Sequence, residues 1–481
     1  MKEKIIRNLK YIIPILILTA FVLLEIYSRS AAMLFNHAMQ EQTMLRGTIS
    51  VEKLAAHLSG HVFFENLEWK DPEGNTILSI PDGSFRVNLL DVVTQRFSST
   101  TIKELTLNRA AISVRLTEDM KWDIIAPTEE LLAKSEEKPK EKPKAKKNDR
   151  AGKSEEELLA AGEKKRQEQR QELEQGWYNF NREGKKLAMN LVLNSCRVEV
   201  LYRNRHYLME SVNLKTDIDT DRSLYVRADT GPFDGTMIGN GITFSGSIDF
   251  KKQAVPICDF AVFVDSVDPS SLGFGMDIHD KMTLSVHFTG EFSHPVGQGT
   301  IHMDRLRIPS LDFSNVDGTL RYEDAMVQFD DVTAAVYEGT LKAKGWYNID
   351  SRYYHIDGYG ENLKARRALP GQKLHCKVKL EIHVHSQGSV QTTSYEGSFS
   401  SGEGRFKQIH FHELRGRFHD VGRDLDFYDV VIDFGGVKAV TDILSVHSGK
   451  LTLAPISVLN NEGQVIVTYY PDSNELEEKV P

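Results

Sequence analysis

The feature that most constrains this chain of 481 residues is a strict alternation of apolar and polar residues over long stretches. The clearest stretch is LHCKVKLEIHVH, residues 374–385. Its apolar positions are Leu374, Cys376, Val378, Leu380, Ile382 and Val384. Because successive side chains of a strand point to opposite faces, this stretch predicts one strand with an apolar face and a polar face. At about 3.3 Å per residue, it would be longer than the usual strand of five or six residues.

Two further stretches repeat the alternation, namely ITFSGSIDF (242–250) and MTLSVHFTGEF (282–292). Together they place eight apolar residues on a single face of their strands: Ile242, Phe244, Ile248, Phe250, Met282, Leu284, Val286 and Phe288. These residues and the six apolar residues of 374–385 are the candidate functional surface.

A multi-strand apolar face must be covered by something, and residues 186–470 contain no amphipathic helix of adequate apolar width. Turn-forming clusters separate the strands, as in a sandwich, a barrel or a solenoid-like sheet. Three arrangements remain: a sandwich that fills its own interior, a sheet that closes on itself, or a curved sheet whose apolar groove receives a ligand. A loose repeat relates 297–345 to the segment that begins at Gly402, and this repetition favours an elongated sheet.

The N-terminus has the pattern of a membrane anchor. Residues 1–10 carry four basic side chains and one acid, and the apolar run 11–27 follows. Seventeen residues are near the lower limit for a spanning helix, and the basic head predicts that the N-terminus stays in the cytoplasm. A cleaved signal peptide ending near Ala32 is the alternative. The positions that represent the predicted anchor are Tyr11, Ile15, Ile17, Phe21, Leu24 and Tyr27.

Composition divides the chain into seven segments. The section after the first β-rich module is rich in Lys, Glu and Pro, and it ends in a polar helix at 154–175, which we interpret as a spacer. Binding of a partner or of a membrane surface is the alternative role for that helix. The predicted segments are a basic head (1–10), an anchor (11–27), a β module (45–126) that opens with a short helix at 51–58, the charged linker and helix (127–176), two β-rich regions (186–350 and 351–470) and a disordered tail (471–481).

The chemistry-bearing residues form no recognisable catalytic pattern. There is no G-x-S-x-G, HExxH or P-loop, so we expect no enzyme and no cofactor. The net charge of −9, without a basic patch, argues against nucleic acid. Two histidine pairs, at 383/385 and 410/412, would bind a metal only if two strands brought them together, and solvated side chains are the alternative. Asp330-Asp331 lacks the rest of a calcium loop.

Two groups of motifs resemble one family. After the anchor, VEKLAAHLSGHVFFENLEWKDPEGNTILSIPDGSFRVNLLDVV and TIKELTLNRAAISVRLTEDMKWDI resemble the N-terminal module of AsmA-like proteins. Further along, LVLNSCRVEVLYRNRHYLMESVNLKTDI, SLYVRADTGPFDGTMIGNGITFSGSIDF and VYEGTLKAKGWYNIDSRYYHIDGYGENLKA resemble the AsmA, YhdP and TamB group. The charged linker and the modest length depart from that pattern.

The resemblance implies a mainly β fold: an elongated, twisted antiparallel β-sheet that forms a hydrophobic groove, with one N-terminal transmembrane helix and a charged helical spacer. It also implies an inner-membrane anchor, a periplasmic body and movement of phospholipid toward the outer membrane. Acyl chains would lie on the candidate surface, no catalytic residues would be present, and an envelope protein would be a partner. An outer-membrane protein assembly factor and a structural scaffold without a ligand remain alternatives.

Overall fold

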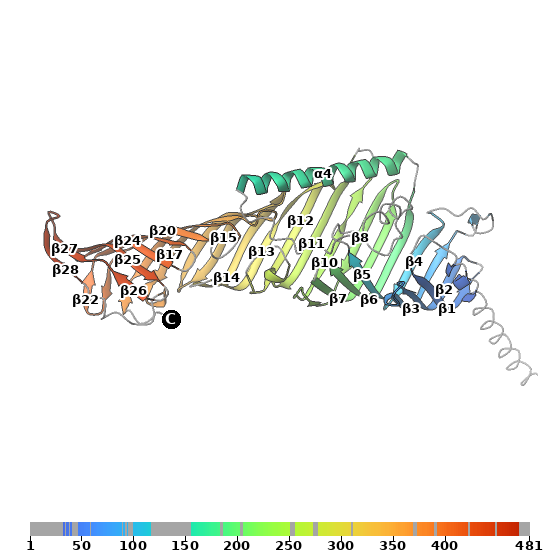
Figure 1. Cartoon of the computed structure of the whole chain (residues 1–481), viewed down its shortest axis with the longest axis horizontal. Coiled ribbons are helices and arrows are strands. Elements are labelled where there is room, and N and C mark those ends of the chain that lie inside the picture. Colours follow the sequence, from blue (N-terminus) through green and yellow to red (C-terminus); the bar gives the residue numbers. More distant parts are fainter. Residues whose placement is uncertain are drawn as a thin grey trace, which may run out of the picture. The chain divides into compact units, whose positions relative to one another are not determined.

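The computed structural model describes residues 32–470 except 34, 38, 41–46, 58, 89, 92–93, 95–99, 117–154, 183–185, 203–204, 251–254, 273–277, 309–310, 369–372, 389–391, 422–423 and 448–449. The predicted anchor (11–27) therefore lies outside the described residues. Among the residues that are described, no helix is long and apolar enough to cross a membrane. The fold is mainly β, and 25 strands form one large mixed sheet (Figure 1).

The chain divides into two compact units, which we describe separately. Unit 1 comprises 1–149 and 174–264, and unit 2 comprises 150–173 and 265–481. Helix α4 (Glu155–Arg182) and strand β11 (Ile257–Val267) have residues in both. The other strands of unit 1 are β1 (Thr48–Ala56), β2 (His61–Lys70), β3 (Thr76–Val87), β4 (Ile102–Asn108), β5 (Ala111–Leu116), β6 (Ala188–Tyr202), β7 (Arg205–Asp219), β8 (Ser223–Asp229), β9 (Phe233–Gly235) and β10 (Gly241–Asp249).

Unit 2 is a succession of hairpins. Its strands in the large sheet are β12 (Met282–Glu291), β13 (His294–Ile308), β14 (Leu311–Glu323), β15 (Met326–Val336), β16 (Gly339–Asn348), β17 (Tyr354–Lys364), β19 (Lys377–Ser386), β20 (Ser394–Ser401), β23 (Glu413–Val421), β24 (Asp424–Asp433), β25 (Val437–His447), β26 (Lys450–Leu453), β27 (Ile456–Asn460) and β28 (Val465–Tyr469). A second sheet joins β18 (Leu374–His375), β21 (Gly404–Phe406) and β22 (Ile409–Phe411). Short helices are η1 (Pro269–Leu272) and α5 (Ala365–Ala368).

Sheet pairing corrects the expectation of a purely antiparallel sheet. In unit 1, β4 and β5 both pair with β6 in parallel. A parallel pair needs a long crossover, and the segment between β5 and β6 contains α4. Every other described pairing between named strands is antiparallel.

Two local predictions were wrong because strand pairing with distant residues overrides the local sequence pattern. Residues 51–56 of the predicted short helix at 51–58 belong to β1, because pairing with β2 outweighs the local helix propensity. The single strand predicted at 374–385 is two strands, interrupted at Cys376. There the chain changes partner, since β18 pairs with β21 whereas β19 pairs with β17 and β20.

Bulges recur along the strands of unit 2. The register shifts where β14, β15, β17 and β24 each hold an Asn or Asp in the left-handed region, with φ between 51° and 57°. These four residues are Asn315, Asp331, Asn362 and Asp429. Asn and Asp tolerate this conformation better than other residues with a side chain. Asp330-Asp331 is therefore part of a bulged strand, not of a calcium loop, and bulges of this kind bend and twist the sheet.

Unit 1 has a packed core at its first strands. Buried residues from β1–β7 form one cluster that includes Val51, Phe64 and Leu193. Ala32, in the helical residues between 32 and 40, is 2% exposed and belongs to this cluster, and Phe35 packs against it. The segment that follows the predicted anchor therefore covers part of the apolar face of unit 1.

Candidate functional site

The register of unit 2 assembles one apolar face from residues far apart in the sequence. Directly paired residues of neighbouring antiparallel strands lie on the same face. One row runs through Val286, Gly299, Leu320, Phe329, Gly345, Ile356, Val384 and Tyr395. A second row runs through Ala343, Gly358, Ile382, Gly397, Phe418, Phe427 and Leu444. We refer to this face as the apolar face of unit 2.

The opposite face of the same strands is mostly polar. Its corresponding row runs through His287, Gln298, Arg321, Gln328, Trp346, His355 and His385. The alternation seen in the sequence is thus kept in register from strand to strand, and the two faces have different chemistry.

Glycines occupy many positions on the apolar face, and large side chains of neighbouring strands lie over them. A Cβ on Gly297 would come within 2.7 Å of the Phe288 ring, and one on Gly416 within 2.6 Å of the Phe399 ring. A Cβ on Gly299 would overlap the carbonyl oxygen of Ser285. Glycine at these positions lets the neighbouring strands approach closely, because it places no side chain between them.

Exposure varies along the rows. Val286 is 5% exposed and Val384 9%, whereas Ile356 is 36% exposed. Leu284, Phe288, Leu380 and Ile382 are half-buried. The face is therefore partly shielded by its own side chains and partly open to solvent.

The structure brings most of the predicted residues onto such a face. In unit 1, Phe244 closes a row that runs through Leu54, Phe64, Gly83, Leu107, Leu193, Leu214 and Ala228. Ile248 pairs with Leu224 and is buried. In unit 2, β12 holds Met282, Leu284, Val286 and Phe288, and β19 holds Val378, Leu380, Ile382 and Val384.

Three predicted residues have other surroundings. Phe250 stacks on Trp177 of α4, with ring centroids 4.9 Å apart. Leu374 pairs with Phe406 in the small three-stranded sheet. Cys376 lies in the interruption between β18 and β19, where a Cβ on Gly404 would come within 2.7 Å of it. Leu374 and Cys376 leave the rows because the chain changes its partner strand there.

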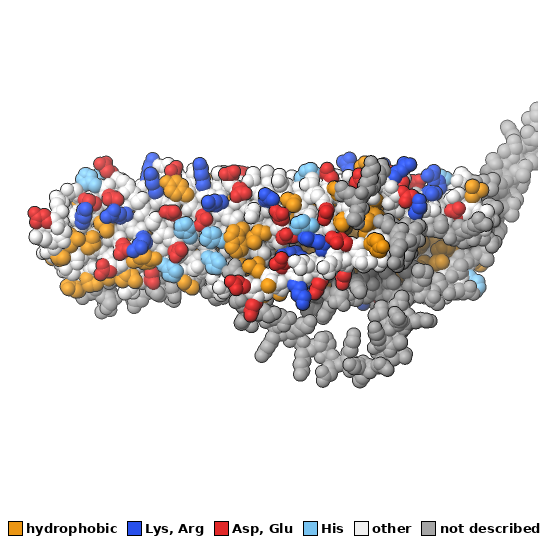
Figure 2. All heavy atoms as spheres, turned by 90° about the horizontal axis from the view of Figure 1, so that it is seen from above, with side chains coloured by type: hydrophobic (Ala, Val, Ile, Leu, Met, Phe, Trp, Pro, Cys, Tyr) orange, Lys and Arg blue, Asp and Glu red, His pale blue; other side chains and the backbone are white. Residues whose placement is uncertain are grey.

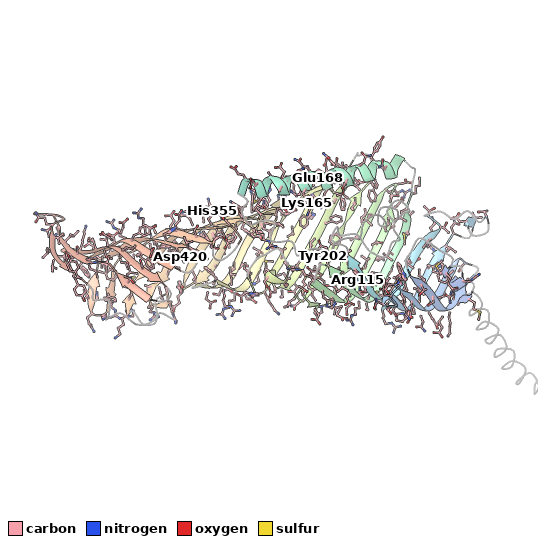
Figure 3. The ribbon with its side chains drawn as sticks, viewed as in Figure 1. Arg115, Lys165, Glu168, Tyr202, His355 and Asp420 are labelled. Atoms are coloured by element: carbon pink, nitrogen blue, oxygen red, sulfur yellow. The ribbon has the colours of Figure 1, made fainter. Side chains whose placement is uncertain are left out.

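Helix α4, which we predicted to be a spacer from its polar sequence, contacts hairpin turns of unit 2. Arg166 pairs with Asp350 in the β16–β17 turn. Arg170 lies 2.6 Å from the ring of His294, the first residue of β13, and 3.3 Å from Asp324 in the turn before β15. A Cβ on Gly162 would come within 2.6 Å of the Asp350 carboxylate. Lys165 and Glu168 (Figure 3), by contrast, are exposed.

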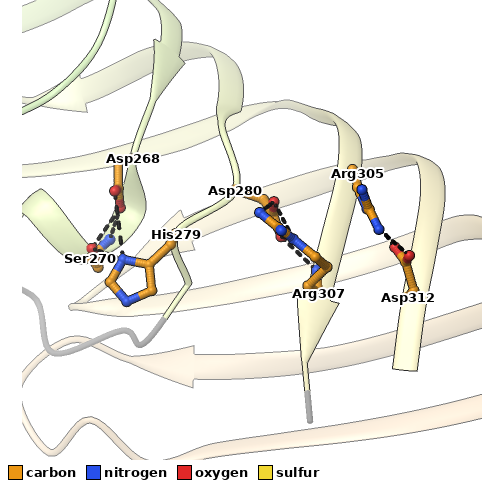
Figure 4. Close-up of polar contacts among 7 residues, drawn as sticks. All are labelled: Asp268, Ser270, His279, Asp280, Arg305, Arg307 and Asp312. Atoms are coloured by element: carbon orange, nitrogen blue, oxygen red, sulfur yellow. Dashed lines mark hydrogen bonds and ion pairs between the residues drawn. The ribbon is translucent and has the colours of Figure 1, made fainter. Parts of the chain in front are cut away.

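The opposite ends of these strands carry further ion pairs (Figure 4). The Arg307 guanidinium donates to Asp280 at 2.7 Å, the backbone N–H of Arg307 donates to the same carboxylate at 2.6 Å, and Arg305 donates to Asp312. These contacts hold the pKa of both carboxyls below the usual range. Glu338 nearby accepts from Lys364 and Arg367, which lowers its pKa to about 2. Ionic contacts thus lie at both ends of the hairpins formed by β13–β17.

The polar face carries a histidine cluster. His383 donates to Asp357 at 2.6 Å, and His355 lies 3.0 Å from the same carboxylate. This carboxylate raises the pKa of His383, and the hydrogen bond from His383 lowers the pKa of Asp357. Within the described ranges, no group of three or more His, Cys, Asp or Glu side chains is arranged to hold a metal ion. The hypothesis of a metal at the histidine pairs therefore gains no support.

Two shallow hollows lie beside β19–β23 and are lined mainly by polar residues. One, of 390 Å³, is lined by Glu361, Asn362, Lys377, Lys379, Ser400, Ser401, Gly402 and Glu413. The other, of 470 Å³, is lined by His375, Glu403, Gly404, Arg405, His410, Phe411 and His412. Neither has the enclosed apolar lining that is typical of a small-molecule site. The apolar face is therefore the better candidate for function.

No family model, no curated protein and no solved structure matches this chain. The resemblance to AsmA-like proteins rests on the sequence motifs alone and stays a prediction.

Proposed function

We propose that this chain binds phospholipid acyl chains along the apolar face of its sheet and conducts them between membranes of the cell envelope. The supporting observation is the register of unit 2, which joins apolar residues of successive strands into continuous rows. An acyl chain gains about 0.8 kcal/mol for each buried CH₂ group, so a long apolar surface can hold it without a specific headgroup contact.

The proposal includes the location of the protein. The basic head and the apolar run at 11–27 would anchor the chain in the inner membrane, with the body in the periplasm. Membrane anchoring would place the apolar face near a source of lipid. The protein would act in lipid homeostasis of the envelope, not as an enzyme.

A structural scaffold without a ligand is the competing function. The packed core of β1–β7 in unit 1 favours it locally, because Ala32 and neighbouring residues cover the face there. The partly open residues of unit 2, such as Ile356, favour lipid. The two functions therefore differ in whether phospholipid stays bound to unit 2 when the protein is isolated.

The test is mass spectrometry of lipid that copurifies with the full chain, extracted in a mild detergent. Val286→Asp and Leu380→Asp each place a charge on the apolar face, and we expect them to lower bound phospholipid several-fold. Their matched controls are Ser285→Asp and Lys379→Asp, which lie next to them on the polar face. Circular dichroism verifies that all four variants keep their sheet content.

Equal lipid content in all four variants would show that lipid does not bind to the apolar face. Lipid-free protein, together with an unchanged fold, would support the scaffold instead.

A further inference from the structure

Strand β28 is an edge strand with an unusually apolar surface. Its only described ladder is with β27. Val465, Ile466, Val467 and Tyr469 are each more than half exposed. Ile466 is the extra residue of a bulge, because the register shifts between the Val458–Val467 and Leu459–Val465 pairs. The strand contains no charged residue. Figure 2 shows hydrophobic side chains gathered where Figure 1 places β27 and β28.

The hairpin that presents β28 is well ordered. Asn460 accepts hydrogen bonds from the backbone N–H groups of Glu462 and Gln464, at 3.0 and 2.8 Å, and Gly463 takes a positive φ. The edge is therefore a fixed structural feature and is available as a template for another strand.

Strand β1 in unit 1 also has a single described ladder, with β2, and its outer edge is protected in a way that the edge of β28 is not. Asn36 donates to the carbonyl oxygen of Val51 at 2.9 Å and accepts from its N–H at 2.8 Å. This side-chain amide imitates a neighbouring strand. Charged residues Glu52 and Lys53 also lie on β1. Proteins usually block exposed edges by such means, and apart from its bulge the described part of β28 carries none of them, so its apolar edge indicates a binding surface.

The backbone of β28 limits what can cover it. In hydrocarbon, an open strand edge would leave its N–H and C=O groups without partners, so insertion into a bilayer is unfavourable. The segment 471–481 begins with proline and contains four acids, one base and few strand-forming residues, so it is a poor partner strand. An antiparallel pair of two copies centred on Val467 would set Glu462 opposite Asp472, which brings like charges together.

We propose that β28 docks a β-strand of another protein, with alternating apolar residues and basic flanks. The added strand would satisfy the backbone groups of the edge, and its alternating apolar side chains would cover exposed apolar residues on one face of β28. A basic flank would meet the exposed Glu462, which lies in the turn before β28. This inference does not depend on lipid binding.

The test measures fluorescence anisotropy with the full chain in detergent and labelled synthetic peptides. The probe is Lys-Lys-Val-Thr-Val-Thr-Val-Lys-Lys. One control peptide has Glu in place of each Lys, and another has Pro in place of the central Val. We expect the probe to bind about tenfold more tightly than either control, a difference of about 1.4 kcal/mol.

Variants separate strand docking from simple charge attraction. Val467→Lys and Val467→Glu are both expected to weaken probe binding about tenfold, because either charge interrupts the apolar edge. Pure charge attraction would instead make the Glu variant bind more tightly. The matched controls are Tyr225→Lys and Tyr225→Glu, because Tyr225 is 59% exposed on β8, which has a partner on each side. They should leave binding unchanged.

Three results would overturn the proposal. The first is equal binding of the proline peptide. The second is a dimer in sedimentation that Val467→Glu dissolves, which would make a second copy the occupant. The third is flotation with phosphatidylethanolamine–phosphatidylglycerol vesicles that both Val467 variants abolish and both Tyr225 variants keep. Copurified lipid, measured on the same samples, reports separately on the function proposed above.

Discussion

At the scale of single residues, glycine shapes the apolar face. The rows of unit 2 alternate large side chains with glycines, as in Val286, Gly299 and Leu320. In most strands glycine weakens pairing, because it offers no side chain to pack. Here the neighbouring residues occupy the space above the glycine, and the backbones come close. Glycine at these positions therefore shapes the face on which function is proposed.

Gly299→Ala is expected to destabilise unit 2 by about 1–3 kcal/mol, because the new methyl group would overlap the Ser285 carbonyl oxygen. The measurement is the shift of the urea denaturation midpoint. Gly402→Ala is the matched control, since a Cβ there meets nothing within 4 Å. A shift for Gly299→Ala no larger than that of the control would show that the strands need no glycine at this position.

At the scale of elements, α4 contacts the sheet through arginine side chains, where a surface helix more often uses a row of apolar ones. Its half-buried residues include Leu159, Gly162, Arg166, Arg170 and Trp177, spaced three, four or seven apart. A search for an apolar stripe overlooks them, because two are arginines and one is glycine. One sequence feature could have predicted the contact side of this helix: Gly162 lies in a strong helix-forming sequence, with arginines four and eight residues later.

Replacing both Arg166 and Arg170 with Ala should loosen the first half of α4 from its turns. The two arginines are only 26% and 34% exposed, so their ion pairs are better shielded than surface pairs. We expect amide hydrogen exchange across the helix to accelerate about tenfold, which corresponds to about 1.4 kcal/mol.

The control for that experiment is Lys164→Ala combined with Lys165→Ala, which removes the same charge from exposed positions of the helix. If both double variants exchange at the same rate, the turn contacts do not hold the helix.

The interrupted strand at 374–385 shows why one prediction of an element was wrong. Residues 374–385 alternate perfectly, yet the strand is interrupted at Cys376. Alternation reports which side chains share a face, but it carries no information about which strand lies alongside. A change of partner strand is therefore invisible in the local pattern.

At the scale of the whole molecule, a lipid function makes affinity depend on acyl length and not on the headgroup. Each additional CH₂ group adds about 0.8 kcal/mol when it is fully buried. We therefore expect the full chain to bind phospholipids with 16-carbon chains more tightly than those with 12-carbon chains, at least about tenfold.

Phosphatidylglycerol and phosphatidylethanolamine of equal chain length should bind alike. The measurement is competition against a fluorescent phospholipid. Strong headgroup preference with no dependence on chain length would place the binding determinants on polar groups and contradict the role of the apolar face.

The sequence by itself determined the β-rich class, the two chemically distinct faces and the polar helix, because strand and helix periodicity are local properties of the chain. Only the tertiary structure decided which strands pair, where bulges shift the register, and which turns hold α4. It also decided that β1 is a protected edge and that β28 is an open one. These features depend on contacts between residues distant in sequence, such as Asn36 with Val51 and Arg166 with Asp350, and no local pattern encodes them.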